Sequence, residues 1–454
     1  MSHLEDQKMA WEIARLVAEK GGRTFYVGGF VRDALIHREN KDVDIEVHGI
    51  MPRELESILD SLGQRLAMGE SFGIFGLKGY SLDIAMPRKE EARGQGHKDF
   101  DIFVDPFIGT EVAARRRDFT FNALMRDVLS GEIVDHFGGE ADLKAGVLRH
   151  VNDTSFAEDP LRVLRAAQFA ARFGFRVAEE TVALCRKMQL QHLPRERIEG
   201  ELKKALLKAE HPSIFFEVLR EMDQLDHWFP ELKALIGVQQ NPVYHSEGDV
   251  WVHTMMVLDE AAKLRDRTAQ PYWFMMSAVA HDFGKAVCTE IKDSVLHAYQ
   301  HEIKGLPLAE TFLRRITSET KLIEYVLNMV EYHMKPNTVA GARSAKKVTT
   351  RMFDQAVDPE GLICIALADD RGRITQEPAT DHEAFLYERL EVFRELMARP
   401  YVMGRDLIEA GLKPGVEFAE ILIHAHKLRL AGVPKDSALK QTLAYARQIY
   451  EKEV

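Results

Sequence analysis

YVGGFVRDALIHRENKDVDIEVHG, residues 26–49, decides the fold of the N-terminal part of the chain. A short aromatic and β-branched run leads into Gly28 and Gly29, and the segment that carries Arg32 and Asp33 has the composition of a helix. The run KDVDIEV then alternates charged and apolar residues, as a strand with one polar face does. We therefore predict a strand, a glycine turn, a helix and a second strand.

The residue types in this unit favour phosphate chemistry. Adjacent glycines let the backbone approach a phosphate, and the following helix offers free N–H groups. Asp42 and Asp44 are two apart, so both carboxylates project from one strand face and repel each other unless a cation lies between them. Mg²⁺ prefers such oxygen ligands together with substrate phosphates. Asp83, in the strand-like LDIAMP, would add a third carboxylate, and three could hold two metal ions. An exposed strand with solvated charges is the alternative.

Outward from this unit the pattern separates an α/β part from a helical part. Residues 9–20 have helical periodicity, and TFYVGG, DVDIEVHG, FGIFGLKG and LDIAMP have the composition of strands. From about Asp159 onward the periodicity is helical nearly throughout, as in LRVLRAAQFAARF, ERIEGELKKALLKA and VHTMMVLDEAAKL. We predict an α/β head with a small mixed sheet over residues 1–150, and all-α parts over 151–238 (neck), 239–398 and 399–454 (tail).

Composition limits the classes of protein. The 454 residues are 46% hydrophobic and 29% charged, as in a globular chain of several domains. No apolar run approaches the ~20 residues that span a bilayer, and the N-terminus lacks the layout of a secretory signal, so we expect a cytoplasmic protein. The three cysteines, Cys185, Cys288 and Cys364, form no CxxC pair. The net charge of −11 argues against non-specific coating of nucleic acid, so RNA would bind at local basic patches.

Five ordered blocks carry a family resemblance. GGFVRD with KDVDIEV, RRRDFTFNAL, DHFGGEADL, EDPLRVLRAAQFAARF and LPRERIEGEL together resemble the DNA polymerase beta-like nucleotidyltransferases, specifically the class II tRNA nucleotidyltransferases (CCA-adding enzymes) and bacterial poly(A) polymerases. The resemblance covers roughly the first 235 residues and extends more loosely to the C-terminus. It implies that Asp42, Asp44 and Asp83 are catalytic and that tRNA, CTP and ATP are the partners, with no obligate protein partner.

The resemblance also implies a nucleotide site. Its residues would be Gly28, Gly29, Arg32, Asp33, Arg116, Arg117, Asp118, Asn122, Glu158, Asp159, Arg162 and Arg165. Asp159 and Arg162, three apart on a predicted helix, would read the base edges of CTP and ATP as an amino-acid template; an intrahelical ion pair is the alternative. Residues 87–103, charged and without clear periodicity, resemble the family's flexible loop and favour complete CCA addition.

A His/Asp-rich pattern marks the third part. His253, His281-Asp282 and Asp369, in a helical context, resemble the HD phosphohydrolase pattern, which implies that these four residues bind a divalent transition metal. His301 and His333 would help to hold a second metal or contact phosphate. The resemblance implies hydrolysis at RNA 2′ and 3′ ends; a degenerate domain kept as an RNA-binding scaffold is the alternative. The tail, with the helix-ending GLKPG, would pack and contact the tRNA elbow.

The favoured function is template-independent addition of CCA to tRNA 3′ ends from CTP and ATP, with pyrophosphate released and Mg²⁺ in the head. The alternatives are an enzyme that adds only CC or only A, and a poly(A) polymerase, although the chain ends in EKEV without a basic extension. From another class, an HD phosphohydrolase with a tRNA-binding head would not need Asp42 and Asp44, and a non-enzymatic RNA chaperone would need neither carboxylate set.

Overall fold

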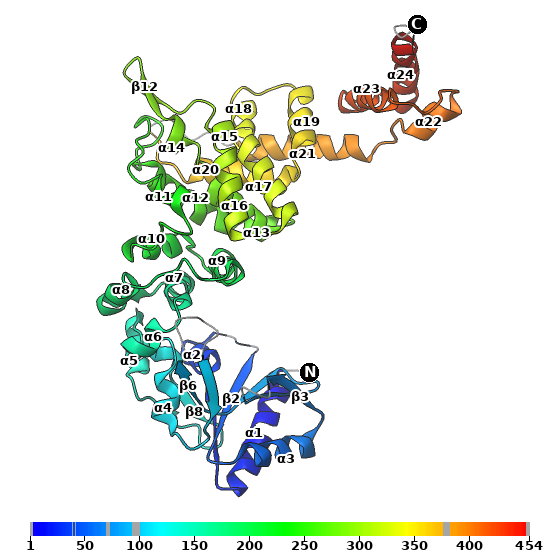
Figure 1. Cartoon of the computed structure of the whole chain (residues 1–454). Helices are drawn as coiled ribbons and strands as arrows, with labels where there is room; N and C mark the ends of the chain where they lie inside the picture. Colours follow the sequence, from blue (N-terminus) through cyan, green and yellow to red (C-terminus); the bar gives the residue numbers. More distant parts are fainter. Residues whose placement is uncertain are drawn as a thin grey trace. The chain divides into compact units, whose positions relative to one another are not determined.

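The computed structural model describes residues 3–38, 40, 42–69, 73–92, 100–375 and 382–450 (Figure 1). The chain divides into two compact units. Unit 1 contains residues 1–205 and 214–227, and unit 2 contains 206–213 and 228–454. The backbone therefore passes from one unit to the other three times. The four-part division predicted from the sequence remains a prediction.

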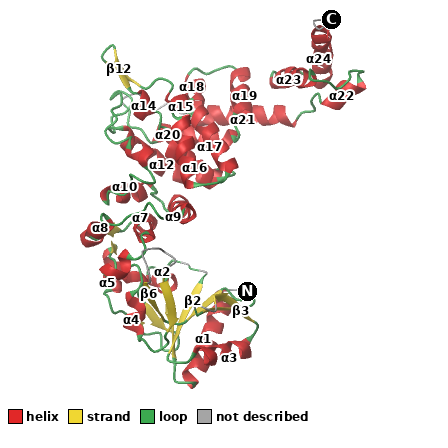
Figure 2. Cartoon of the chain, viewed as in Figure 1, coloured by secondary structure: helices red, strands yellow, loops and turns green. Residues whose placement is uncertain are grey.

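The main sheet of unit 1 lies in the α/β head (Figure 2). Seven strands of the described residues form one sheet in the order β3-β4-β5-β2-β1-β8-β9. Strands β2 and β5 run parallel and the other neighbours run antiparallel, which confirms the predicted small mixed sheet. Its strands are β1 (Arg23–Val27), β2 (Val43–His48), β3 (Arg65–Gly69), β4 (Ile74–Leu77), β5 (Leu82–Ala85), β8 (Met125–Asp127) and β9 (Ile133–Val134).

Helix α1 (His3–Glu19) covers one face of this sheet, because Ala10, Ile13, Ala14 and Val17 recur at helical spacing and are all buried. The other helices of the head are α2 (Gly29–Leu35), α3 (Pro52–Leu62), α4 (Thr110–Arg115), a short helical turn at Thr120–Asn122, α5 (Gly139–Ala145) and α6 (Asp153–Ala157). The predicted strand–turn–helix–strand order of residues 26–49 is thus present, with Gly28 at a φ of +63° in the turn.

Helices follow the head, as the periodicity predicts. The remaining helices of unit 1, some of which extend across its boundary, are α7 (Leu161–Phe173), α8 (Glu179–Cys185), α9 (Arg195–Lys208) and α10 (Ser213–Glu221). Phe169 and Phe173 of α7 pack with Phe121 in a cluster of aromatic rings whose centroids are 5.7–6.4 Å apart. This cluster joins α7 to the helical turn at Thr120–Asn122.

Unit 2 is built almost wholly from helices. They are α11 (Pro230–Lys233), α12 (Val250–Leu264), α13 (Pro271–Ala280), α14 (Lys285–Cys288), α15 (His301–Lys304), α16 (Leu306–Ile316), α17 (Thr320–Tyr332), α18 (Lys335–Gly341), α19 (Lys346–Gln355), α20 (Pro359–Arg371), α21 (Glu383–Ala398), α22 (Gly404–Glu409), α23 (Phe418–Leu430) and α24 (Lys435–Tyr450), with a helical turn at Arg265–Arg267. The core of this unit is lined by side chains such as Trp251, Phe274, Phe283 and Phe312, which are fully buried.

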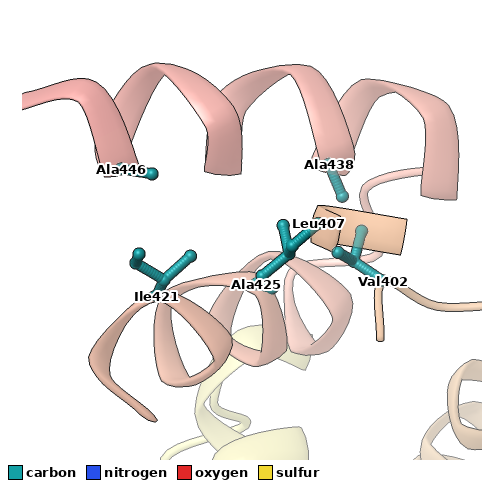
Figure 3. Packing of buried hydrophobic residues seen from close by; sticks show 6 residues of the cluster. All are labelled: Val402, Leu407, Ile421, Ala425, Ala438 and Ala446. Carbon is teal, nitrogen blue, oxygen red and sulfur yellow. The ribbon is translucent and has the colours of Figure 1, made fainter. Parts of the chain in front are cut away.

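The last three helices share a small apolar cluster of their own (Figure 3). Ile421 and Ala425 of α23 face Ala438 and Ala446 of α24, and Leu407 of α22 completes the contact. Alanines at the contact let α23 and α24 approach closely. The predicted turn GLKPG lies between α22 and α23, where Gly411 has a φ of +93°.

Several short strands are absent from the sequence prediction. Residues 87–103 were expected to form a loop, but both arms are strands, β6 (Arg88–Ala92) and β7 (Phe100–Val104), which pair antiparallel. Backbone pairing between the arms supplies the order that the side-chain pattern does not indicate. The centre of this segment, residues 93–99, lies outside the described residues. The pairs β10 (Val147–Leu148) with β11 (Arg176–Val177), and β12 (Glu290–Lys292) with β13 (Val295–His297), were also missed because each strand has only two or three residues.

Candidate functional site

Three carboxylates gather at the head sheet. Asp44 of β2 and Asp83 of β5 are directly paired across the parallel strands, and Asp42 immediately precedes β2. Burial, and then repulsion from Asp83, raises the pKa of Asp44 to about 6, although the Arg117 guanidinium opposes the shift. The pair of strands thus concentrates negative charge that a divalent cation would neutralise.

Two arginines are held beside these carboxylates by a glutamate that the sequence analysis did not select. Glu46 is buried, and one of its oxygens lies 3.4 Å from Arg116 Nη2 and 3.2 Å from Arg117 Nη2. His48 Nε2 lies 2.9 Å from the other oxygen. Burial opposes the charged form of Glu46, but the bond from His48 and the two guanidinium groups outweigh it and lower its pKa to about 2.

The glycine turn borders the same place. A Cβ added at Gly28 would lie 3.7 Å from Arg117 Nη1 and 3.9 Å from Asp44 Oδ2. The backbone of the turn therefore lies next to one carboxylate and one guanidinium. A triphosphate bound here would meet a guanidinium group and backbone N–H groups on one side. On its other side it would meet carboxylate oxygens that can bind a metal ion.

The predicted nucleotide-binding residues behind this turn form a continuous hydrogen-bond network. Arg32 is buried and donates from Nε to Asp33 (2.7 Å) and from Nη1 to Asn122 (2.8 Å). Asn122 donates to Asp118 (2.9 Å), and Arg165 Nε donates to the other oxygen of Asp118 (2.7 Å). These charges are thus satisfied by one another, and the Arg32 guanidinium also lies over the rings of Phe169 and Phe173, which joins α2 to α7.

The EDxxR block differs from its predicted geometry. Asp159 lies before the start of α7, so Asp159 and Arg162 do not share a helix face, and the expected helical arrangement was wrong. Proline at position 160 explains the late start, because the residue before a proline is disfavoured in the helical region. Asp159 instead pairs with Arg197 of α9 at 2.9 Å, and Arg162 donates to the backbone oxygens of Ser155 (2.5 Å) and Arg116 (2.7 Å). Glu158 is exposed at the turn.

Unit 2 holds a second cluster of charged side chains, which is buried. Ligand atoms of His253, His281 and Asp369 all lie within 4.8 Å of one another, and so do those of Asp282, His301 and His333. The structure therefore brings together all six residues that the sequence analysis selected there. Helix α12 carries His253, α20 carries Asp369, α15 begins at His301, and the C-terminal ends of α13 and α17 carry the other histidines.

The histidines of this cluster are oriented in a common way. The Nδ1 atoms of His281, His301 and His333 lie 2.9, 3.0 and 2.7 Å from the backbone oxygens of Ala278, Ala298 and Val330. Since a carbonyl only accepts, each Nδ1 must donate, and in a neutral ring Nε2 then carries a lone pair. Burial and the charges of His301 and His281 lower the pKa of His333 to about 3, so its ring is neutral. Neutral imidazole with a free Nε2 is the form that binds a metal.

Two observations favour a cation at this cluster. His281 Nε2 is buried and has no hydrogen-bond partner, and both oxygens of the Asp282 carboxylate lack a partner of hydrogen-bond geometry, although Lys285 Nζ lies 2.7 Å from one of them. Such atoms are costly to bury unless a ligand satisfies them. The donor set of imidazoles and carboxylates fits a divalent transition metal.

The outer residues of the cluster are not among those predicted from the sequence. Glu247 is in contact with His253 Nδ1 at 3.0 Å and with His245 Nδ1 at 2.8 Å, and it accepts the backbone N–H of Ile374. A carboxylate on the far nitrogen of a ligand histidine fixes its tautomer and orientation. Lys285 is also charged and lies close to Asp282. Because it follows His281 by only four residues, its place in the cluster could have been predicted from the sequence.

Comparison with known proteins gives the family of the chain. The "Poly A polymerase head domain" family model matches residues 24–149, and "Probable RNA and SrmB- binding site of polymerase A" matches residues 174–236. The multifunctional CCA protein of Alkalilimnicola ehrlichii is 34% identical over 426 residues, which cover 91% of this chain and 98% of that protein. The chain belongs to the multifunctional CCA protein family. The Actinobacillus pleuropneumoniae (serotype 5b) member is 38% identical over 326 residues, which cover 70% of this chain and 77% of that protein.

Solved structures show the same fold as this multifunctional CCA protein family member. A CCA-adding enzyme in its apo form II is 20% identical, with a TM-score of 0.67 over 97% of this chain and 95% of that one. The Thermotoga maritima CCA-adding enzyme complexed with tRNA has a TM-score of 0.64 at the same identity and coverage. Asp42, Asp44, Asp83, Arg116 and Arg117 all fall within the segment that the head model matches. Among the described residues, no helix is both long and apolar enough to cross a membrane.

Proposed function

We propose that this chain adds CCA to the 3′ end of tRNA, using CTP and ATP and releasing pyrophosphate. The observation that carries the proposal is the juxtaposition of Asp42, Asp44 and Asp83 with Arg116 and Arg117, in a chain of the multifunctional CCA protein family. Carboxylates that hold cations beside guanidinium groups that hold phosphates are what nucleotidyl transfer needs. We expect the enzyme to act in the cytoplasm.

The reaction is the attack of the tRNA 3′-oxygen on the α-phosphorus of the nucleotide. A bond forms between these atoms as the 3′-hydroxyl loses its proton to water, the bond from the α-phosphorus to the bridging oxygen breaks, and the electron pair of that bond leaves with pyrophosphate. Asp42, Asp44 and Asp83 would hold Mg²⁺, which would make the hydroxyl acidic and neutralise the leaving group. Arg116 and Arg117 are positioned by Glu46 to bind the phosphates.

Nucleotide selection is assigned to Asp159 and Arg162. Since Asp159 is paired with Arg197 and Arg162 with two backbone oxygens, the base must compete with these partners for the two side chains. Arg197, the partner of Asp159, is a flexible charged side chain, so an exchange of hydrogen bonds is chemically reasonable.

The experiment is an extension assay with Mg²⁺ and tRNA transcripts that end before CCA, after C or after CC, with CTP and ATP given separately and together. Growth of all three RNAs to one CCA end is the expected result. Products that stop at CC, or addition of A to the CC-ended RNA alone, would indicate a partial enzyme. Long A tracts would indicate a poly(A) polymerase.

The cluster in unit 2 supports a second activity, hydrolysis of phosphate at RNA 2′ and 3′ ends. Four histidine rings direct Nε2 toward two buried carboxylates, which would hold a divalent metal, and that metal would supply hydroxide near neutral pH. His253, His281, Asp282 and Asp369 are the proposed ligands, and His301 and His333 are proposed for a second metal or for phosphate. Loss of 2′,3′-cyclic phosphate hydrolysis in His281→Ala, with CCA addition retained, is expected; equal hydrolysis would exclude this assignment.

A further inference from the structure

A second cavity lies in the head, on the face of the sheet opposite to the carboxylates. The pairing of the strands shows which residues lie on each face of the sheet. Phe25 of β1 is opposite Glu46 of β2, whereas Tyr26 of β1 is opposite Ile45 of β2 and Arg126 of β8. Opposed residues on neighbouring strands share a face, so Tyr26 and Arg126 face away from Asp44 and Glu46. The cavity measures about 450 Å³ and is lined by His3, Gln7, Tyr26, Phe30, Ala34, Arg38, Asn40 and Arg126.

The lining combines an aromatic wall with positive charge. The rings of Tyr26 and Phe30 lie 4.6 Å apart, and His3 lies 5.9 Å from Phe30. Two guanidinium groups, Arg38 and Arg126, also line the cavity, and none of its lining residues that the structure describes is a carboxylate. An anion that carries a flat ring therefore meets complementary groups throughout the cavity.

Two buried nitrogens at this cavity lack hydrogen-bond partners. They are Nε of Arg126 and Nδ1 of His3. A buried polar atom without a partner costs free energy, which a bound ligand or water recovers. Gln7 and Asn40 order the wall of the cavity, because Gln7 Nε2 lies 2.8 Å from His3 Nε2 and Asn40 Nδ2 donates to Asp33 at 3.0 Å.

We propose that this cavity binds a nucleoside monophosphate at a site separate from the catalytic carboxylates. The base stacks against Tyr26 and Phe30, and Arg126 and Arg38 hold the phosphate. The volume fits a single small molecule rather than a continuous RNA strand. The site also lies next to the catalytic row, because Asn40 accepts the backbone N–H of Asp42 at 3.0 Å.

The test measures how many moles of radiolabelled AMP bind per mole of full-length protein by equilibrium dialysis in EDTA. Ala34 is exposed and lines the cavity, so Ala34→Phe fills it. Ala18→Phe is the matched control, on an exposed position of α1 roughly 22 Å along the helix from His3. We expect Ala34→Phe to bind one equivalent fewer than the wild type and Ala18→Phe.

A second variant keeps the proposal falsifiable if Ala34→Phe fails to fold. Arg126→Met keeps the length of the side chain and should weaken this site for AMP at least tenfold. Inorganic phosphate alone should bind at least tenfold more weakly than AMP, since it lacks the ring. Equal AMP stoichiometry and affinity in all variants would overturn the proposal, and so would binding of a short RNA in place of AMP.

Discussion

Asp44 is the carboxylate of the catalytic row whose pKa is raised by burial and by its two neighbours, Asp83 and Asp42. Its pKa of about 6 is raised above the unfolded value, so its contribution favours the folded state at low pH and is lost as the pH rises through about 6. In EDTA, Asp44→Asn should therefore stabilise the fold at pH 7 by up to about 3 kcal/mol while it abolishes nucleotidyl transfer. Thermal unfolding measured from pH 4.5 to 8 checks this, and a variant with the wild-type pH dependence would contradict it.

Glu46 acts through the two arginines that it holds. Glu46→Gln keeps a partner for His48 but removes the negative charge beside Arg116 and Arg117. We expect kcat/KM for CTP and ATP to fall about tenfold, which corresponds to about 1.4 kcal/mol, with most of the change in KM. Steady-state kinetics measure this split, and an unchanged KM would remove Glu46 from the positioning role.

Glu247 is the comparable residue of the cluster in unit 2. Because it fixes the ring of His253 from the far side, Glu247→Gln should weaken metal binding about 10- to 100-fold. Metal content after dialysis against graded chelator concentrations is the measurement. CCA addition by the same preparation is the control and should equal that of the wild type.

At the scale of elements, close helix packing sets the spacing of the metal ligands. A Cβ at Gly372, at the end of α20, would lie 2.7 Å from the backbone of Val257 in α12. These two helices carry Asp369 and His253, whose ligand atoms are 3.0 Å apart. Gly372→Ala should push the helices apart, lower stability by about 1–3 kcal/mol and reduce bound metal.

The matched control for this change is Gly341→Ala at the end of α18, where a Cβ would meet no atom within 4 Å. Denaturant unfolding and metal analysis of both variants make the comparison. Equal behaviour of the two alanine variants would show that contact between α12 and α20 does not set the site.

The elements also explain what sequence patterns could predict. Helix α7 coincides with its predicted run, residues 161–173, because its buried residues recur at helical spacing and Pro160 and Gly174 bound it. The carboxylates of β2 and β5 were predicted because both lie in short strands of β-branched residues. Strand β3 lies at the edge of the sheet and pairs with the adjacent β4, and its run lacks β-branched residues, so it was missed. Strand β8 was missed because it has only three residues and pairs with β1 from a distant part of the chain.

The outer residues of both clusters could not be predicted in the same way. Glu46 continues the alternation from Asp42, but its role depends on where Arg116 and Arg117 lie in the fold. Glu247 precedes α12 in a stretch without periodicity, and its contact with His253 depends on how that loop folds. Asp159 lies outside the helix predicted for it because Pro160 disfavours the helical region at the residue before it.

At the scale of the whole molecule, unit 1 needs residues from beyond its first boundary. Gln224 donates to the backbone oxygens of Cys185 (2.7 Å) and Met188 (2.9 Å), and Arg186 donates to that of Glu221. A fragment of residues 1–227 should therefore unfold cooperatively, whereas residues 1–205 should have a lower Tm or fail to fold. Calorimetry of both fragments decides this, and equal Tm values would contradict it.

The triple passage of the backbone between the units has a consequence for proteolysis. A protease that cuts once within residues 206–213 produces two fragments, and each retains segments of both units. The N-terminal fragment keeps part of 206–213, and the C-terminal fragment keeps 214–227. Such a nicked chain should migrate as one species on a native gel and separate only in denaturant, so a single cut would leave the protein assembled.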